Sequence, residues 1–297
     1  MPYVFRNPVG AGDTSLTTLN RDAYINGSVD GVNFLFDTTF PFSYPGGNYI
    51  GRPAAGAPAN GALIADIAEK GNGSFVKDAA TMTYAGGGFD FSALNNNNSC
   101  YVAATNSTLS NIFASQYYMI FMYIKLPTLA NWNTSGSISP FFTTTLSYYV
   151  VDVDLGVFCF TNSPALQVRR QTAVGAQTPI TIDNSSTLPL STHYGLMAQV
   201  AFWRTASETG IRVKSSGGTS LVTAASGSAN SANFSSNIPR FGPATNPFGS
   251  TMTRQYRIYR GGIENLAISG RNPVTVLDAD WTRVQTRITA SGNTIFV

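Results

Sequence analysis

Residues 256–281, YRIYRGGIENLAISGRNPVTVLDADW, decide how the chain folds because they join strand signals to helix signals. The first part alternates apolar and polar residues around Gly261 and Gly262, which predicts two short strands joined by a tight turn at the glycine pair. The second part predicts a helix. Its purpose needs an explanation, because most of the preceding chain reads as a succession of strands.

The helix is predicted over residues 273–287. Asn272 is a good N-cap residue, and Pro273 suits the first helical position, where its missing N–H costs nothing. Apolar residues then recur at intervals of three and four, at Val274, Leu277, Trp281, Val284 and Ile288. The solvent side is expected to carry Asp278, Asp280, Arg283 and Arg287. We therefore expect the helix to cover an apolar surface, and Trp281→Ala to cost about 3–5 kcal/mol.

The composition favours strands and turns elsewhere. Charged residues make up 11% of the 297 residues, whereas 43% are hydrophobic and 12% aromatic, which is enough for a folded core. Short apolar segments bounded by Gly, Pro, Asn or Ser predict strands. The segment YYMIFMYIKL at 117–126 is apolar on both faces, which predicts a central strand, because Tyr, Ile and Phe favour a strand over the competing helix.

The N-terminal part differs from the rest. Residues 1–45 hold polar, turn-rich segments and one apolar run, GVNFLFDTTFPF at 31–42. We predict an extended arm for attachment or oligomerisation over residues 1–45, and one β domain over residues 46–297. For Phe34 and Phe36 two alternatives stay open, an edge strand of the chain's own sheet or burial on a partner. Deleting residues 1–28 is expected to leave a folded domain that no longer assembles.

Charge and cysteine content argue against several classes of partner. A net charge of +3 is too small to favour nucleic acid, and the many arginines suit ion pairs and subunit contacts. The longest apolar stretch is too short to span a membrane, and no secretory pattern is visible, so we expect synthesis in a cytoplasm. Cys100 and Cys159 can form a disulfide or remain thiols, and no Cys/His spacing predicts zinc.

The order of the segments resembles a known family, the concanavalin A-like, laminin-G-like jelly roll, over roughly residues 60–285. Four segments carry the resemblance: GSFVKDAATMTYAGGGFDFSALNNNNSCYVAA, YYMIFMYIKL, STHYGLMAQVAFWRTASETGIRVKSSGG and IPRFGPATNPFGSTMTRQYRIYRGGIENLAISGRNPVTVLD. It implies an all-β, antiparallel jelly-roll sandwich with a short C-terminal helix that covers one open end of the core, which follows the extended N-terminal arm predicted above. Members often have an Asp before the last long strand, where it helps to form a calcium site or a turn. Arg254 and Gln255 stand there, so calcium binding is not carried over.

Candidate glycan-binding residues are few. Trp132 in the polar loop NWNTSGS is the best candidate for an exposed ring that stacks on a sugar, and a ring that anchors this loop to the sandwich is an equal alternative. Asp152 and Asp154 lie two positions apart in a predicted strand, so their carboxylates point to one face and could hold a glycan, bind a divalent cation or share a proton. A solvated strand face explains this pair better, because two carboxylates supply too few ligands for calcium.

Residues for catalysis are missing from the sequence. Glycan hydrolases with this fold commonly use Glu-x-Asp-x-Glu on one strand. The three glutamates, Glu69, Glu208 and Glu264, have no Asp within two positions. His193 is the sole histidine, and no G-x-S-x-G turn presents a nucleophile to it, so it is better explained as a residue that caps the start of a strand. We therefore expect a protein that is not an enzyme and has no cofactor.

Together these features predict a structural protein of a bacteriophage particle, in the tail, the baseplate or the capsid surface. The prediction rests on the lack of a secretory pattern, the low-charge β-rich composition and the N-terminal arm. Its partners would be other virion proteins or further copies of the chain, after synthesis in the host cytoplasm. The alternative is a carbohydrate-binding module that recognises glycans of the host surface.

Overall fold

The computed structural model describes residues 22–47, 56–77, 82–94, 99–132, 139–144, 157–161, 164–173, 175–244 and 255–297. Strands of one sheet are β1 (Val32–Asp37), β4 (Thr83–Ala85), β5 (Gly88–Asp90), β7 (Tyr118–Lys125), β12 (Met197–Arg204), β13 (Glu208–Ser215), β14 (Gly218–Ala225) and β16 (Arg257–Asn265). Strands of the other are β2 (Leu63–Ile64), β3 (Gly73–Lys77), β6 (Cys100–Ala103), β8 (Ser139–Thr143), β9 (Val157–Thr161), β10 (Ala165–Ala173), β11 (Ala176–Asp183) and β15 (Arg240–Phe241). The helices are α1 (Ser107–Phe113), α2 (Leu266–Ser269) and α3 (Pro273–Ala290), with 3-10 turns η1 (Ala23–Ile25), η2 (Leu129–Asn131) and η3 (Leu190–His193).

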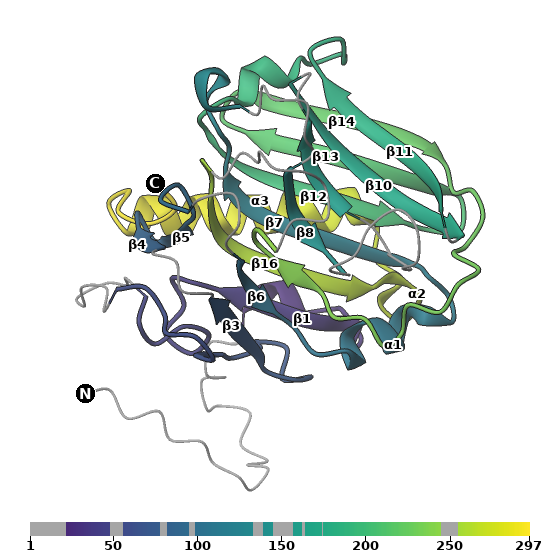
Figure 1. Cartoon of the computed structure of the whole chain (residues 1–297), viewed down its shortest axis with the longest axis horizontal. Helices are drawn as coiled ribbons and strands as arrows, with labels where there is room; N and C mark the ends of the chain where they lie inside the picture. The colour runs from purple at the N-terminus through teal and green to yellow at the C-terminus, as the bar shows by residue number, and fades with distance from the viewer. Residues whose placement is uncertain are drawn as a thin grey trace, which may run out of the picture.

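The two antiparallel sheets pack on each other as a sandwich, which confirms the predicted all-β jelly-roll class (Figure 1). The first sheet, here the β7 sheet, has the order β14-β13-β12-β7-β16-β5-β4, and β1 also pairs with β16. The second, the β10 sheet, has the order β11-β10-β9-β8-β15-β6-β3-β2. Among the described residues no helix has the length and apolarity needed to cross a membrane.

Strand β7 is the buried central strand that the segment 117–126 predicts. It lies between β12 and β16, and Tyr118 to Ile124 are all buried. Alternate side chains serve two cores, because successive residues of a strand point to opposite faces. Ile120 and Met122 enter the core between the sheets, whereas Phe121 and Tyr123 enter a second core on the outer face of the β7 sheet.

The terminal helix covers this outer face, and the expectation that it closes an open end of the sandwich is wrong. Leu277 and Val284 of α3 join Phe121, Trp203 and Tyr259 of the β7 sheet in the second core. Figure 1 shows α3 running across the strands of this sheet. The physical reason is the apolar outer face of β7, β12 and β16, which would face water without the helix.

The helix itself begins and is capped as predicted. The Asn272 side-chain oxygen accepts a hydrogen bond from the Thr275 N–H at 3.0 Å, and Pro273 occupies the first turn. The expected solvent position of Asp280 is wrong, because its side chain is only 1% exposed. The buried face is also rotated: Val276 is buried, and Trp281 is only partly buried.

The predicted turn at Gly261 and Gly262 is wrong, since β16 continues through both residues and pairs with β7 along its length. The glycines make room for aromatic rings. A Cβ atom on Gly261 would lie 2.7 Å from the Phe36 ring, and one on Gly262 would lie 2.7 Å from the Phe121 ring. The second strand expected after the turn does not extend beyond Asn265. The short helix α2 begins there instead, and the Asn265 side-chain oxygen caps it.

Strand β1 resolves the two alternatives for Phe34 and Phe36. It pairs with β16 from Val32↔Glu264 to Asp37↔Arg260, and both phenylalanines are fully buried between the sheets. The chain therefore supplies this strand to its own sheet. Residues 1–21 of the predicted arm lie outside the described residues, and the attachment role of the arm stays a prediction.

Candidate functional site

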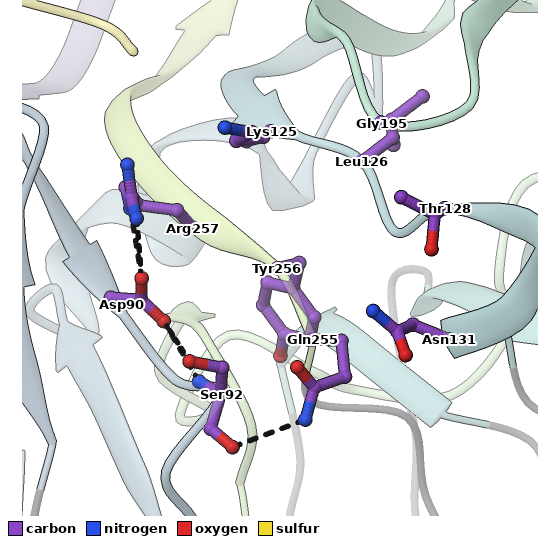
Figure 2. Close-up of a pocket in the computed structure, with 10 residues that line it drawn as sticks. All are labelled: Asp90, Ser92, Lys125, Leu126, Thr128, Asn131, Gly195, Gln255, Tyr256 and Arg257. Atoms are coloured by element: carbon purple, nitrogen blue, oxygen red, sulfur yellow. Dashed lines mark hydrogen bonds and ion pairs between the residues drawn. The ribbon is translucent and has the colours of Figure 1, made fainter.

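A polar pocket of about 190 Å³ lies where several strands of the β7 sheet end (Figure 2). Strand β5 ends at Asp90, β7 ends at Lys125, and β16 begins at Arg257. Connecting segments complete the walls. The lining residues are Asp90, Ser92, Lys125, Leu126, Thr128, Asn131, Gly195, Gln255, Tyr256 and Arg257.

Strand register places three charged residues of this pocket in one row. Arg257 of β16 is the Cα partner of Lys125 on β7 and of Asp90 on β5. Directly opposite residues of an antiparallel pair share one face of the sheet, so the two cations and the carboxylate are neighbours. The pocket therefore brings together residues that lie far apart in the sequence.

The carboxylate of Asp90 is held by its neighbours. The Arg257 guanidinium donates to Asp90 Oδ2 from Nε at 3.1 Å and from Nη2 at 2.6 Å. The Ser92 hydroxyl and N–H donate to Asp90 Oδ1 at 2.6 and 2.9 Å. Burial alone would raise the pKa of Asp90, but the hydrogen bonds from Ser92 and Arg257 outweigh burial and lower it. Asp90 is therefore ionised at neutral pH.

The rest of the pocket offers uncharged polar groups. Figure 2 shows Asp90, Ser92 and Arg257 on one side, Thr128 and Asn131 on the other, and Gln255 and Tyr256 between them. The Gln255 amide donates to the Ser92 carbonyl at 3.2 Å, which ties the two segments together. The Tyr256 ring is buried and packs against Phe91, so it forms an apolar floor.

Trp132 follows Asn131 of the pocket lining, and it does not form the exposed platform that is one of the two alternatives predicted from the sequence. Its side chain is 2% exposed, its ring packs against Tyr194 at 5.1 Å, and its indole N–H donates to the Thr161 carbonyl at 2.9 Å. The Trp132 ring instead matches the other predicted alternative, a ring that anchors this loop to the sandwich. Because Trp132 follows Asn131, it holds the loop that forms one wall of the pocket. A direct contact of the ring with a glycan stays a prediction.

Asp152 and Asp154 lie outside the described residues, so their predicted glycan role stays a prediction. Among the described residues no group of three or more His, Cys, Asp or Glu side chains could hold a metal ion. The pocket residues themselves carry no sequence motif. Their register partners become visible only in the folded sheet, which is why the sequence did not identify them.

His193 is a buried structural residue in η3, where the sequence suggests a strand cap. Its Nδ1 lies 2.7 Å from Ser215 Oγ and its Nε2 lies 2.8 Å from Ser220 Oγ, so the imidazole links η3 to the β13–β14 hairpin. Burial lowers the pKa of His193. Both ring nitrogens contact hydroxyls, and among the residues that the structure describes no carboxylate orients the ring as in a catalytic triad.

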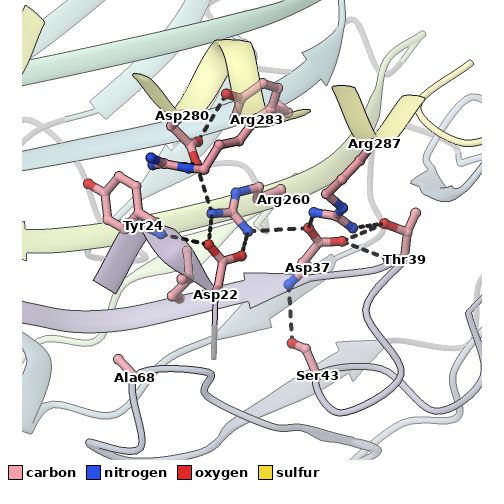
Figure 3. A network of polar contacts seen from close by, with 12 residues as sticks. Asp22, Tyr24, Asp37, Thr39, Ser43, Ala68, Arg260, Asp280, Arg283 and Arg287 are labelled. Carbon is pink, nitrogen blue, oxygen red and sulfur yellow. Dashed lines mark hydrogen bonds and ion pairs between the residues drawn. The ribbon is translucent and has the colours of Figure 1, made fainter. Parts of the chain in front are cut away.

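A second polar cluster lies under α3, around the buried guanidinium of Arg260 (Figure 3). Arg260 bonds to Asp22 at 2.5 Å, to Asp37 at 3.2 Å and to Asp280 at 3.1 Å. Burial alone would raise the pKa of Asp37, but Arg287 and Arg260 lower it to about 2. The cluster joins the N-terminal segment, β1, β16 and α3, and its charges compensate one another, so it stabilises the fold.

The sequence matches no model of a known protein family and no curated protein. The fold does match solved structures. A structure of botulinum neurotoxin type C, whose cell entry is dependent upon interaction with two ganglioside molecules, has a TM-score of 0.52 and 11% identity over 82% of this chain and 52% of that chain. The botulinum neurotoxin serotype D binding domain has a TM-score of 0.50 and 13% identity over 83% of this chain and 53% of that chain.

A Trypanosoma rangeli sialidase in complex with sialic acid has a TM-score of 0.47 and 12% identity over 84% of this chain. The chain spans 32% of that sialidase and about half of the toxin chains, at 52% and 53% of their lengths. The toxin structures establish similarity at the level of the fold. The chain is an antiparallel β-sandwich of the jelly-roll type.

Proposed function

We propose that the chain is a non-enzymatic carbohydrate-binding module that holds a glycan in the pocket between β5, β7 and β16. The pocket itself carries this proposal: hydroxyl, amide and charged groups converge there over the apolar floor formed by Tyr256. A concave site with a few convergent polar groups is typical of small-ligand binding.

Sugars suit this set of groups. Each sugar hydroxyl can donate and accept a hydrogen bond, and the amides of Asn131 and Gln255 also offer both functions. Segments at the end of a rigid sandwich commonly carry binding residues. This chain shares its fold with structures of botulinum neurotoxins. Cell entry of the type C toxin is dependent upon interaction with two ganglioside molecules, and this supports a glycan as the ligand class here.

The carboxyl groups of the pocket favour glycan binding without hydrolysis. Glycoside hydrolysis commonly uses two carboxyl groups that flank the scissile bond. The pocket has one, Asp90, and this carboxylate is engaged by Arg257 and Ser92. An engaged carboxylate with a lowered pKa is a poor general acid at neutral pH.

The experiment is a glycan array followed by calorimetry on the best ligand. We expect Asn131→Ala to weaken binding about tenfold, the factor that corresponds to about 1.4 kcal/mol for a lost hydrogen bond. Asn26→Ala removes an exposed asparagine outside the pocket and serves as the matched control. Absence of any glycan binding at high protein concentration, or equal affinities of the two variants, would contradict the proposal.

We propose, second, that this module is displayed on a bacteriophage particle, in the tail, the baseplate or the capsid surface, after synthesis in the host cytoplasm. One observation favours assembly with a neighbour. Among the described strands β14 forms an edge of the β7 sheet, and its sequence GTSLVTAA has no charge and no proline. Proteins usually protect long edge strands with such residues, so contact with another virion protein or another copy explains this edge.

A charge on β14 tests this second proposal. We expect Thr223→Lys to leave the fold intact and to reduce association, measured by sedimentation velocity of the wild type and the variant. Glu208→Gln, at the start of the neighbouring strand β13, is not a suitable control. The Glu208 carboxylate accepts a hydrogen bond from the Trp203 indole N–H, so this variant would also change a contact within the fold. Asn26→Ala again serves as the control. A wild type that stays monomeric at high concentration and is absent from purified particles would exclude the assembly role.

A further inference from the structure

Lys125 differs from the other two charged residues that line the pocket, Asp90 and Arg257, because those two pair with each other. It ends β7 and is partly exposed, and within the described part of the chain its ammonium group has no hydrogen-bond or ion-pair partner. The Lys125 ammonium is therefore available to a ligand in the pocket that it lines.

The neighbours of Lys125 leave the pocket with an excess of positive charge. Lys125 and Arg257 are register partners on adjacent strands, and like charges in this position disfavour each other. One carboxylate, Asp90, lies in the same row, and it is already bound by Arg257 at 2.6 Å. Two cations thus share one anion, so a second anion placed beside Lys125 would be stabilised.

We infer that the pocket selects saccharides that carry a carboxylate, with the carboxylate against the Lys125 ammonium. This inference rests on the proposed glycan-binding function and adds the chemical class of the sugar. Thr128, Asn131 and Gln255 meet hydroxyl groups of the same ligand across the pocket. Neutral sugars can make those hydrogen bonds, but they leave the Lys125 charge uncompensated.

Matched ligands separate charge from shape. Uronic-acid and sialic-acid oligosaccharides are printed on an array beside the methyl ester of each, which keeps the sugar ring and removes the charge. We expect the wild type to bind an acid and to bind its ester at least about tenfold more weakly, a difference of about 1.4 kcal/mol. The affinity for the acid should fall when the salt concentration rises from about 50 to about 300 mM, because partly exposed ion pairs are screened.

Variants then assign the effect to Lys125. We expect Lys125→Gln to lose the preference for the acid and its salt dependence, and Lys125→Arg to keep both. Lys77→Gln removes one positive charge on β3 of the other sheet and should behave as the wild type. Thermal unfolding of each variant checks that the sandwich is intact.

Three outcomes overturn the inference. If acid and ester bind equally and Asn131→Ala still weakens both, the glycan function stands and the selection for acids is wrong. If Lys125→Gln keeps the preference for the acid, the carboxylate is bound elsewhere. If no glycan of either kind binds, the proposed function fails together with the inference.

Discussion

His193 is the residue whose burial has a direct consequence for pH dependence. It is the sole histidine of the chain, and burial lowers its pKa in the folded state. In the unfolded chain its pKa returns to about 6.5. Below that pH the unfolded state binds the proton more readily, so the free energy of unfolding should fall as the pH is lowered through this range.

The free energy of unfolding, measured with denaturant at several pH values between about 7.5 and about 5, checks this expectation because the range includes the reference pKa. His193→Gln removes the titrating group while it retains hydrogen-bonding capacity toward Ser215 and Ser220. Between about pH 7.5 and about pH 6, the free energy of unfolding should change less with pH in the variant than in the wild type, because the variant lacks a group with an unfolded-state pKa of about 6.5. An equal slope in both proteins would mean that other groups cause the pH dependence.

Arg260 is the residue on which the buried charge cluster depends. Its guanidinium is 1% exposed and compensates Asp22, Asp37 and Asp280. Arg260→Met should therefore cost about 3–5 kcal/mol, because it removes the central cation that all three carboxylates share.

Arg283 offers the matched control in the same cluster. It contacts Asp280 at 3.4 Å, and its side chain is 34% exposed. Arg283→Met should cost less than about 1 kcal/mol, as is usual for solvent-screened pairs. Equal losses of unfolding free energy for the two variants would show that the cluster contributes through packing rather than through the central charge.

At the scale of elements, α3 acts as a cover for the outer face of the β7 sheet. Leu277 is fully buried in this second core, whereas Trp281 is partly exposed and stacks on Tyr123 with the rings 10° from parallel. We expect Leu277→Ala to cost about 2–5 kcal/mol and Trp281→Ala to cost less than the 3–5 kcal/mol expected from the sequence.

Chemical denaturation of both variants measures the two costs. Thr286→Ala alters an exposed position on the opposite side of α3 and controls for a change in helix propensity. A larger loss for Trp281→Ala than for Leu277→Ala would contradict the observed rotation of the helix. No loss for either variant would mean that α3 does not stabilise the sheet.

At the scale of the whole molecule, the N-terminal segment is built into the sandwich from Asp22 onward. Asp22 bonds to Arg260, and the Tyr24 hydroxyl donates to Glu264 Oε2 at 2.7 Å. Deletion of residues 1–28 should therefore lower the free energy of unfolding, whereas deletion of residues 1–21 spares both contacts. This narrows the proposed attachment segment to residues 1–21.

The two deletions separate stability from assembly. We expect the protein without residues 1–21 to unfold as the full chain does and to fail in assembly, measured by thermal unfolding and by sedimentation velocity. Normal assembly of this variant would contradict the attachment proposal. Unchanged stability after deletion of residues 1–28 would show that Asp22 and Tyr24 contribute little to the fold.

Local rules explain which elements the sequence predicted correctly. The cap at Asn272, the proline at the first helical position and the apolar spacing define α3 without any neighbour, because they act within a few residues. The two-sided apolar pattern of residues 117–126 likewise predicts β7, because a strand that is apolar on both faces must be covered on both. The jelly-roll class was implied by the resemblance of the order of these segments to a known family.

The tertiary structure decided the features that depend on pairs distant in the sequence. Gly261 and Gly262 suit a turn equally well, and only the rings of Phe36 and Phe121 show why a straight strand needs them. Asp280 has the spacing of a solvent position, and only its tertiary partners, the Arg260 guanidinium and the Tyr123 hydroxyl, make its burial favourable.

The candidate site is the clearest case of this kind. Asp90, Lys125 and Arg257 are separated by 35 and 132 positions of sequence, and no local pattern links them. Strand register alone makes them neighbours, and register is set by the packing of both sheets. The sequence by itself therefore determined elements such as α3 and β7 and indicated the class of fold, whereas the tertiary structure determined which charges meet in the pocket and which of them remains uncompensated.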